Sequence, residues 1–219
     1  MKPVKWFVPL FIFFLAILIS GCINYEQKTV LNSDGSGTMK IHYWAKSSNI
    51  MGDELSGFGF TEDKAREKFS SPNIQVGEVK VEEKKEDSTK HVYLDLKFKD
   101  INKLTEAKGF SKIKASWQKG KEGMEFVYTL LKDTANSGFG MSDYKLIYEF
   151  EFPNEIISSN GKIDGKKVSW NKTLADLNND VELKAVIKSE KKCGIFGIEL
   201  PIVILFGLIF MYRLRSRKK

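Results

Sequence analysis

The feature that most limits the fold is an alternation of apolar and polar residues with a period of two. It is regular in His91–Lys99, and it returns in Tyr144–Phe152 after one slip. Successive side chains on a strand point to opposite faces, so this pattern predicts half-buried antiparallel strands. Further strand candidates are Tyr25–Leu31, Thr38–Ala45, Ile74–Glu82, Phe110–Gln118, Met124–Leu131, Val168–Trp170 and Val181–Lys188.

Glycine-containing turns separate several of these segments. Asn-Gly and Asp-Gly pairs tolerate positive φ and therefore favour tight hairpins. The apolar phase of the Ile74 segment changes at Gly77, which predicts a β-bulge. The hairpin candidates are Asp34–Gly37, Lys119–Gly123, Asn160–Gly161, Asp164–Gly165 and the charged turn Glu82–Lys90.

Helix signals in the middle of the chain are few. Thr61 can cap a helix over Glu62–Phe69, and Asp100 can cap one over Ile101–Lys108 that Gly109 closes. The predicted fold class is therefore α+β, with a mainly antiparallel sheet built from hairpins and two or three short helices. One C-terminal transmembrane helix, described below, completes it.

The N-terminus carries the pattern of an exported lipoprotein. Lys2 and Lys5 precede an apolar run over residues 6–19, and the small residues Ser20 and Gly21 stand before Cys22. This order resembles a lipobox, which predicts a signal peptide over residues 1–21 and acyl chains on Cys22. The alternative is an uncleaved signal anchor, but an ordinary anchor does not require Ser-Gly-Cys at the outer edge of its apolar run.

A second apolar run, Ile195–Tyr212, lies near the C-terminus. Its 18 residues would span roughly 27 Å as a helix, about the thickness of a bilayer core. Five cations follow, as expected of a cytoplasmic stop signal. We therefore expect a transmembrane helix over residues 193–212, a basic cytoplasmic tail over 213–219 and an extracytoplasmic domain over 22–192, lipid-anchored and single-pass in the cell membrane. A buried core helix is the alternative.

The basic composition reflects this targeting. The chain has 35 Lys and Arg against 28 Asp and Glu, but the leader holds two of the cations and the tail five. Since Glu199 is the only anion outside the domain, the exported segment carries 28 cations against 27 anions. A nearly neutral domain gives no support to nucleic acid as a partner.

No catalytic or metal-binding motif stands out. His42 and His91 are the only histidines, 49 residues apart in separate strands, and we interpret them as strand-face residues. An Asn32-x-Asp34-x-Ser36 pattern lacks the closing carboxylate of a calcium loop, because Tyr43 holds that position. The sequence therefore predicts no enzyme, no metal and no cofactor.

The second cysteine, Cys193, has no disulfide partner if Cys22 is acylated. It is either a juxtamembrane thiol or part of a tripartite C-terminal sorting signal, which would make the tail a site of processing.

Aromatic side chains are the best candidates for ligand contact. Some lie on predicted strands and others on segments loosened by glycine, in the patterns Gly-Phe-Gly-Phe and Gly-Phe-Gly-Met. They can fill the core, line a cavity that is partly open, or touch the bilayer surface. The candidate contact residues are Trp44, Trp117, Trp170, Phe58, Phe60, Phe139 and Met141.

Two stretches resemble a known family. They are the turn Leu31–Thr38 after the first strand and the region from Phe152-Pro153 through Ser159-Asn160-Gly161 to Asp164–Trp170. Together with the lipobox and the C-terminal apolar run, they are similar to LppM-type lipoproteins. The resemblance implies an envelope protein whose exported α+β domain is related to lipid-binding folds with a sheet wrapped around a helix, and it supplies no catalytic residues.

Three functions follow as hypotheses. The first is a module that binds lipid or lipoglycan, and the second is an assembly protein that holds an envelope partner through its sheet edges. An envelope hydrolase is the third and has the least support. Double anchoring at Cys22 and near Ile195 further predicts that Tyr25–Leu31 and Val181–Lys188 are antiparallel neighbours at one membrane-facing side.

Overall fold

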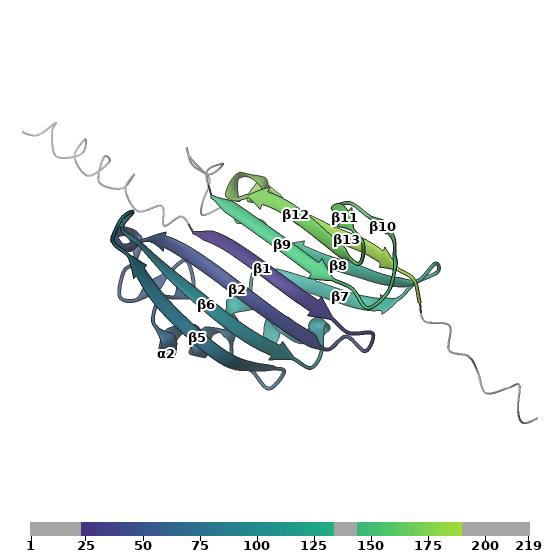
Figure 1. The fold of residues 1–219 in the computed structure, drawn as a ribbon, viewed down its shortest axis with the longest axis horizontal. Helices are drawn as coiled ribbons and strands as arrows, with labels where there is room; N and C mark the ends of the chain where they lie inside the picture. Colours follow the sequence, from purple (N-terminus) through teal and green to yellow (C-terminus); the bar gives the residue numbers. More distant parts are fainter. Residues whose placement is uncertain (1–22, 134–143, 190–219) are drawn as a thin grey trace, which may run out of the picture. The chain divides into compact units, whose positions relative to one another are not determined.

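The computed structural model describes residues 23–133 and 144–189, and it contains every strand that the alternation predicts (Figure 1). A seven-stranded sheet has the order β11-β12-β9-β1-β2-β6-β5. All its neighbours are antiparallel except β1 and β9, which run parallel. Its strands are β1 (Asn24–Leu31), β2 (Gly37–Lys46), β5 (Ile74–Lys84), β6 (Thr89–Phe98), β9 (Lys145–Glu151), β11 (Lys162–Asp164) and β12 (Lys167–Thr173).

A second sheet has four antiparallel strands in the order β10-β13-β8-β7. A small hairpin of two short strands, which the sequence did not predict, stands apart from both sheets. The four strands are β7 (Ile113–Lys119), β8 (Met124–Leu130), β10 (Ile156–Ser159) and β13 (Val181–Ile187), and the hairpin consists of β3 (Glu54–Leu55) and β4 (Phe58–Gly59).

One face of the large sheet is covered by two different layers. The small sheet packs on the half that holds β1, β9 and β12, where the Phe126 ring lies 4.7 Å from Phe150 and the Tyr128 ring 5.8 Å from Tyr148. Helix α2 (Glu62–Phe69) covers the half that holds β2, β6 and β5. These two layers bury the apolar face that the alternation produces, and the opposite face of the large sheet carries mostly polar side chains, with an aromatic group around Trp44 and Tyr93.

Helix α2 begins where the sequence predicts. The hydroxyl of Thr61 accepts a hydrogen bond from the backbone N–H of Lys64, and Phe69 packs inward 5.2 Å from the ring of Phe110. The expected helix over Ile101–Lys108 is wrong in type: it consists of the 3-10 segments η2 (Ile101–Glu106) and η3 (Lys108–Phe110).

Asp100 still caps η2 by accepting from the N–H of Asn102. The backbone leaves helical geometry at Lys103 and is extended at Ala107, so no continuous α-helix forms. The other 3-10 segments are η1 (Ser47–Asn49) and η6 (Leu174–Asn178). No helix within 23–133 and 144–189 is long and apolar enough to cross a bilayer, and the span expected at 193–212 lies outside these ranges.

Most predicted turns are confirmed. The Asp34–Gly37 turn joins β1 to β2, with Gly35 at a φ of 86°, and Lys119–Gly123 joins β7 to β8. The register of β5 against β6 shifts between Val76 and Val79, which places the expected bulge at Gly77. Asn160–Gly161 is not a hairpin, because β10 belongs to the small sheet and β11 to the large one.

The predicted pairing of the first and last strands is wrong. β1 lies between β9 and β2, whereas β13 lies between β10 and β8. The final residue of β13, Ile187, pairs with Met124 beside the β7–β8 turn, while Val181 pairs with Leu130 near the start of β1. The first strand therefore starts, and the last strand ends, at opposite ends of the domain (Figure 1). The parallel β9 takes the place beside β1 that the sequence argument gave to β13.

Candidate functional site: an apolar pocket between the sheets

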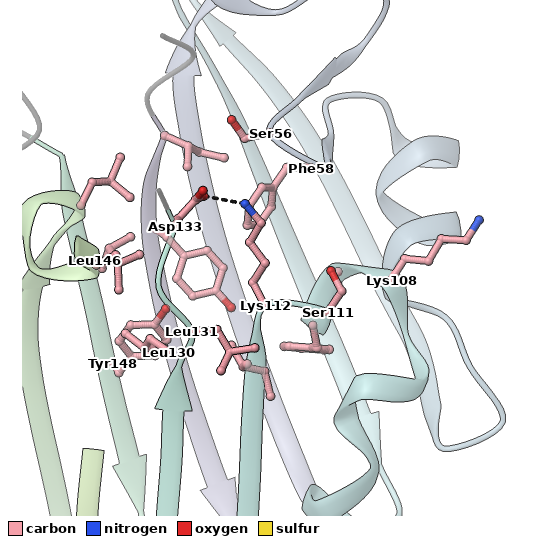
Figure 2. Close-up of a pocket in the computed structure, with 18 of the residues that line it drawn as sticks. Ser56, Phe58, Lys108, Ser111, Lys112, Leu130, Leu131, Asp133, Leu146 and Tyr148 are labelled. Atoms are coloured by element: carbon pink, nitrogen blue, oxygen red, sulfur yellow. Dashed lines mark hydrogen bonds and ion pairs between the residues drawn. The ribbon is translucent and has the colours of Figure 1, made fainter. Parts of the chain in front are cut away.

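A pocket of about 430 Å³ opens at the end of the domain where β1 begins. We call it the apolar pocket (Figure 2). Six parts of the chain meet there: the starts of β1 and β9, the end of β8 with the residues that follow it, the β3–β4 turn, η3 with the start of β7, and η6. Its volume falls within the range of about 300–1,000 Å³ that is common for small-molecule sites.

Apolar and aromatic side chains make up most of the wall. On the aromatic side, the Tyr25 ring lies 5.9 Å from Phe58 and 5.5 Å from Tyr148. The aliphatic side is formed by Ile23, Ile113, Leu130, Leu131, Leu146, Leu174 and Leu177. Such a surface binds apolar groups by removing them from water, at about 25 cal/mol per Å².

A cluster of buried polar side chains lies beside this wall. Gln27 is 1% exposed, and its side-chain oxygen accepts hydrogen bonds from the hydroxyls of Tyr25 at 2.8 Å and Tyr128 at 3.3 Å. The Gln27 amide donates to the hydroxyl of Thr29. Burial raises the pKa of the Tyr25, Tyr128 and Tyr148 phenols, so all three stay neutral at physiological pH. The cluster links β1 to β8 and gives the pocket a neutral, hydrogen-bonding end.

Charged side chains occur at the rim. Figure 2 shows Lys112 reaching across to the carboxylate of Asp133, at 2.5 Å, while Lys108 points away from the group. Lys108 instead pairs with Glu67 of α2 at 3.3 Å. Lys112 is 61% exposed and Asp133 only 12%, so this ion pair marks the border between the pocket and solvent.

The structure separates the aromatic residues that the sequence grouped together. Phe58 lines the pocket, whereas Phe60 is fully buried beneath Tyr43. Trp117 and Trp170 are buried in the core, where their ring N–H groups donate to the carbonyl of Ser33 and the side chain of Asn160. Trp44 is half-buried on the outer face of the large sheet, on the side away from the pocket. Phe139 and Met141 lie outside the described residues.

Sequence reasoning missed most of the pocket. Its aliphatic residues come from segments far apart in the chain, and each fits an ordinary strand or loop on its own. One local signal was available: Leu174 and Leu177 stand three residues apart in the segment that opens with the Thr173–Asp176 capping box, which predicts a short helical turn with one apolar side.

Comparison with known proteins identifies the family. The family model described as the LppM domain matches residues 32–188, well over half of the chain. The chain belongs to the LppM family. Among solved structures, it is similar to the folded domain of Mycobacterium tuberculosis LppM, determined by NMR, with 14% identity, a TM-score of 0.44, and coverage of 78% of this chain and 92% of that one. A search of curated proteins finds no significant match.

The family match confirms the resemblance to LppM-type lipoproteins and is consistent with membrane association. LppM is not a known enzyme family. The match includes most of the pocket wall, since only Ile23 and Tyr25 precede residue 32. Within the lining, the ionisable side chains are the Lys112–Asp133 pair, Lys108 and three neutral tyrosines. This arrangement favours binding of an apolar group over proton transfer.

Proposed function

We propose that this LppM-family protein is a membrane-anchored envelope lipoprotein whose domain binds lipid or lipoglycan without catalysis. The apolar pocket carries this proposal. Its aliphatic and aromatic wall suits an acyl chain, and the neutral Gln27–tyrosine cluster can remain dry beside it because its hydroxyls already have an acceptor.

The position of the pocket supports the same function. Ile23 lines the pocket and directly follows Cys22, the expected site of acylation. Acyl chains on Cys22 would therefore hold this end of the domain near the bilayer. A lipid entering the pocket would then travel a short path from the membrane, with little exposure of its apolar portion to water.

The strand pairing that double anchoring predicted is wrong, so anchoring at both ends would require one particular orientation of the domain. The first strand begins at the pocket end and the last strand ends at the opposite one, with about six residues between Lys188 and the apolar run. An extended tether of that length reaches roughly 20 Å, so both anchors can enter one leaflet only if the strands lie nearly along the membrane.

In the Cys193→Ser background, energy transfer from dyes on Ser33→Cys and Ser88→Cys to an acceptor at the bilayer surface measures this orientation, because the two turns lie at opposite ends of β1 and β2. Similar heights are expected. A difference close to the strand length, about 25 Å, would contradict double anchoring.

Assembly through sheet edges is the alternative, and one observation weakens it. At the edge strand β5, Arg66 of α2 donates hydrogen bonds to the carbonyls of Val76 and Gly77 at the bulge. These two carbonyls are therefore already occupied, and the bulge interrupts the row of groups that a partner strand would use.

Filling the pocket tests the proposal. Leu177→Trp adds bulk inside the wall, whereas Ile163→Trp makes a similar change at a side chain on β11 that is 45% exposed and outside the pocket. Native mass spectrometry of the full chain, released from membranes in mild detergent, should find bound lipid on the parent and on Ile163→Trp. It should find little on Leu177→Trp. Equal occupancy in all three proteins, or a parent that carries no lipid but co-purifies with a protein, would refute lipid binding in this pocket.

A further inference from the structure

The only two histidines of the chain meet on the outer face of the large sheet, away from the apolar pocket. β2 and β6 pair in a register that places His42 opposite Tyr93 and Trp44 opposite His91. His42 and His91 are therefore diagonal neighbours on one face. His42 Nε2 lies 2.9 Å from His91 Nδ1.

Aromatic neighbours fix the position of His42. Its ring stacks between Tyr93, at 4.3 Å and 7°, and Trp44, at 4.5 Å and 20°. The centroids of the two imidazoles lie 5.2 Å apart, with 18° between the ring planes. This is the centroid distance expected for two rings that lie nearly in one plane and point nitrogens 2.9 Å apart straight at each other. The rings thus meet edge to edge with their inner nitrogens facing each other.

Each outer nitrogen faces an oxygen. His91 Nε2 lies 2.9 Å from the Thr89 hydroxyl, which donates its own proton to Asp87 and must accept from the imidazole. His91 therefore carries its proton on Nε2, leaving the lone pair of Nδ1 aimed at His42. On the other side, His42 Nδ1 lies 3.4 Å from the carboxylate of Glu26, which can accept a hydrogen bond from that nitrogen when it carries the proton.

When the proton of His42 is on Nδ1, the lone pair of His42 Nε2 points into the space between the two rings, as the lone pair of His91 Nδ1 does. Both inner nitrogens could then bind one metal ion. The outer N–H of each ring would donate a hydrogen bond to an oxygen, as is usual for metal-bound histidines. Metal binding would release no net proton, because the proton of His42 only moves from Nε2 to Nδ1. Burial lowers the pKa of both imidazoles, which keeps them neutral and able to bind a metal at pH 7.

We propose that His42 and His91 form a binding site for a late first-row divalent metal ion, such as Zn²⁺ or Cu²⁺, between their inner nitrogens. Metal–nitrogen bonds of about 2.0–2.1 Å at a tetrahedral angle place the two nitrogens about 3.3 Å apart. The rings therefore need to separate by a few tenths of an ångström, and each has to turn by about 35° so that its lone pair points at the metal instead of at the other nitrogen.

The surroundings favour a cation. The carboxylates of Glu26, Glu82 and Asp87 act on this pair, and the ammonium of Lys84 opposes them. Lys80 pairs with Glu82 at 2.5 Å, so Glu26 and Asp87 supply the remaining negative charge. Within the ranges that the structure describes, no three His, Cys, Asp or Glu side chains converge, so water completes the coordination. Imidazole ligands select Cu²⁺, Ni²⁺ and Zn²⁺ over Mg²⁺ and Ca²⁺, which prefer oxygen.

Calorimetric titration of the full chain in detergent tests this site, using a purification tag without histidine. Cys193→Ser serves as the parent, because a free thiol also binds Zn²⁺. We expect one equivalent of Zn²⁺ on the parent and none on His42→Asn or His91→Asn, with no heat from Mg²⁺. Glu26→Gln should weaken binding about 10–100-fold through the outer hydrogen bond. Asp95→Asn, on the same face but paired with Lys40, should leave the affinity unchanged.

A second readout uses Trp44, whose ring lies 4.5 Å from His42. Cu²⁺ should quench a component of the tryptophan fluorescence that is missing in Trp44→Phe, and both histidine variants should lose this quenching while keeping the circular dichroism of the parent. The proposal is overturned if the folded parent binds no metal, or if either histidine variant binds as the parent does.

Discussion

Gln27 tests how the two sheets are held together beside the pocket. Its side-chain oxygen is the acceptor for the hydroxyls of Tyr25 and Tyr128, and all three residues are buried. Gln27→Leu keeps the approximate volume but removes the acceptor. Two phenol hydroxyls would then remain in the interior without the acceptor that they share.

The magnitude follows from these contacts. A buried polar group without a partner costs about 1–3 kcal/mol, so two of them cost about 4 kcal/mol together. Burying the leucine returns about 2 kcal/mol. We therefore expect Gln27→Leu to lower the free energy of unfolding by about 2 kcal/mol. The triple variant Tyr25→Phe, Gln27→Leu, Tyr128→Phe removes the donors as well and should regain most of this loss.

Equilibrium unfolding of the full chain in detergent by urea measures both effects. The fluorescence of the buried Trp117 and Trp170 reports the transition. The reasoning fails if Gln27→Leu unfolds at the same urea concentration as the parent, or if the triple variant is less stable than the single one.

Three further predictions concern the helix contact and the anchors. Gly59→Ala would place its Cβ 2.5 Å from the carbonyl carbon of Lys64, so thermal unfolding should show a loss of about 1–3 kcal/mol; an unchanged melting temperature would contradict this packing. Cys22→Ala should leave a longer precursor that incorporates no labelled fatty acid, and migration as the mature form would count against the lipobox. On intact cells, and with Cys193 replaced by Ser in both proteins, an impermeant thiol reagent should label Ser88→Cys but not Ser216→Cys, and the reverse result would invert the topology.

The strands could be predicted because their burial is periodic. In β6, Val92, Leu94, Leu96 and Phe98 are buried, as the alternation requires. The strands that escaped prediction are β3, β4, β10 and β11, which have two to four residues each, too few for alternation to be distinguished from chance. Local sequence therefore determined which longer segments are strands, but it did not determine their partners.

Partner choice depends on contacts that are distant in sequence. β9 pairs with β1 in parallel, from Tyr25 opposite Leu146 to Val30 opposite Glu151. No local sequence signal predicts this pairing, and β9 occupies the position beside β1 that was expected for β13. The contact of His42 with His91 likewise depends on the register of β2 against β6. The histidines lie on a strand face as predicted, but their 49-residue separation gave no reason to bring them together.

Lipid binding in the apolar pocket is the central claim, and isotope-filtered NOEs test it most directly. The measurement uses the full chain in detergent with ¹³C-labelled methyl groups and an added lipid whose acyl chain is unlabelled. The account predicts NOEs from acyl methylenes to the methyl groups of Leu131, Leu174 and Leu177, and none that survive in Leu177→Trp. NOEs confined to exposed methyl groups such as those of Val30 and Ile163, or identical NOEs in the filled variant, would contradict it.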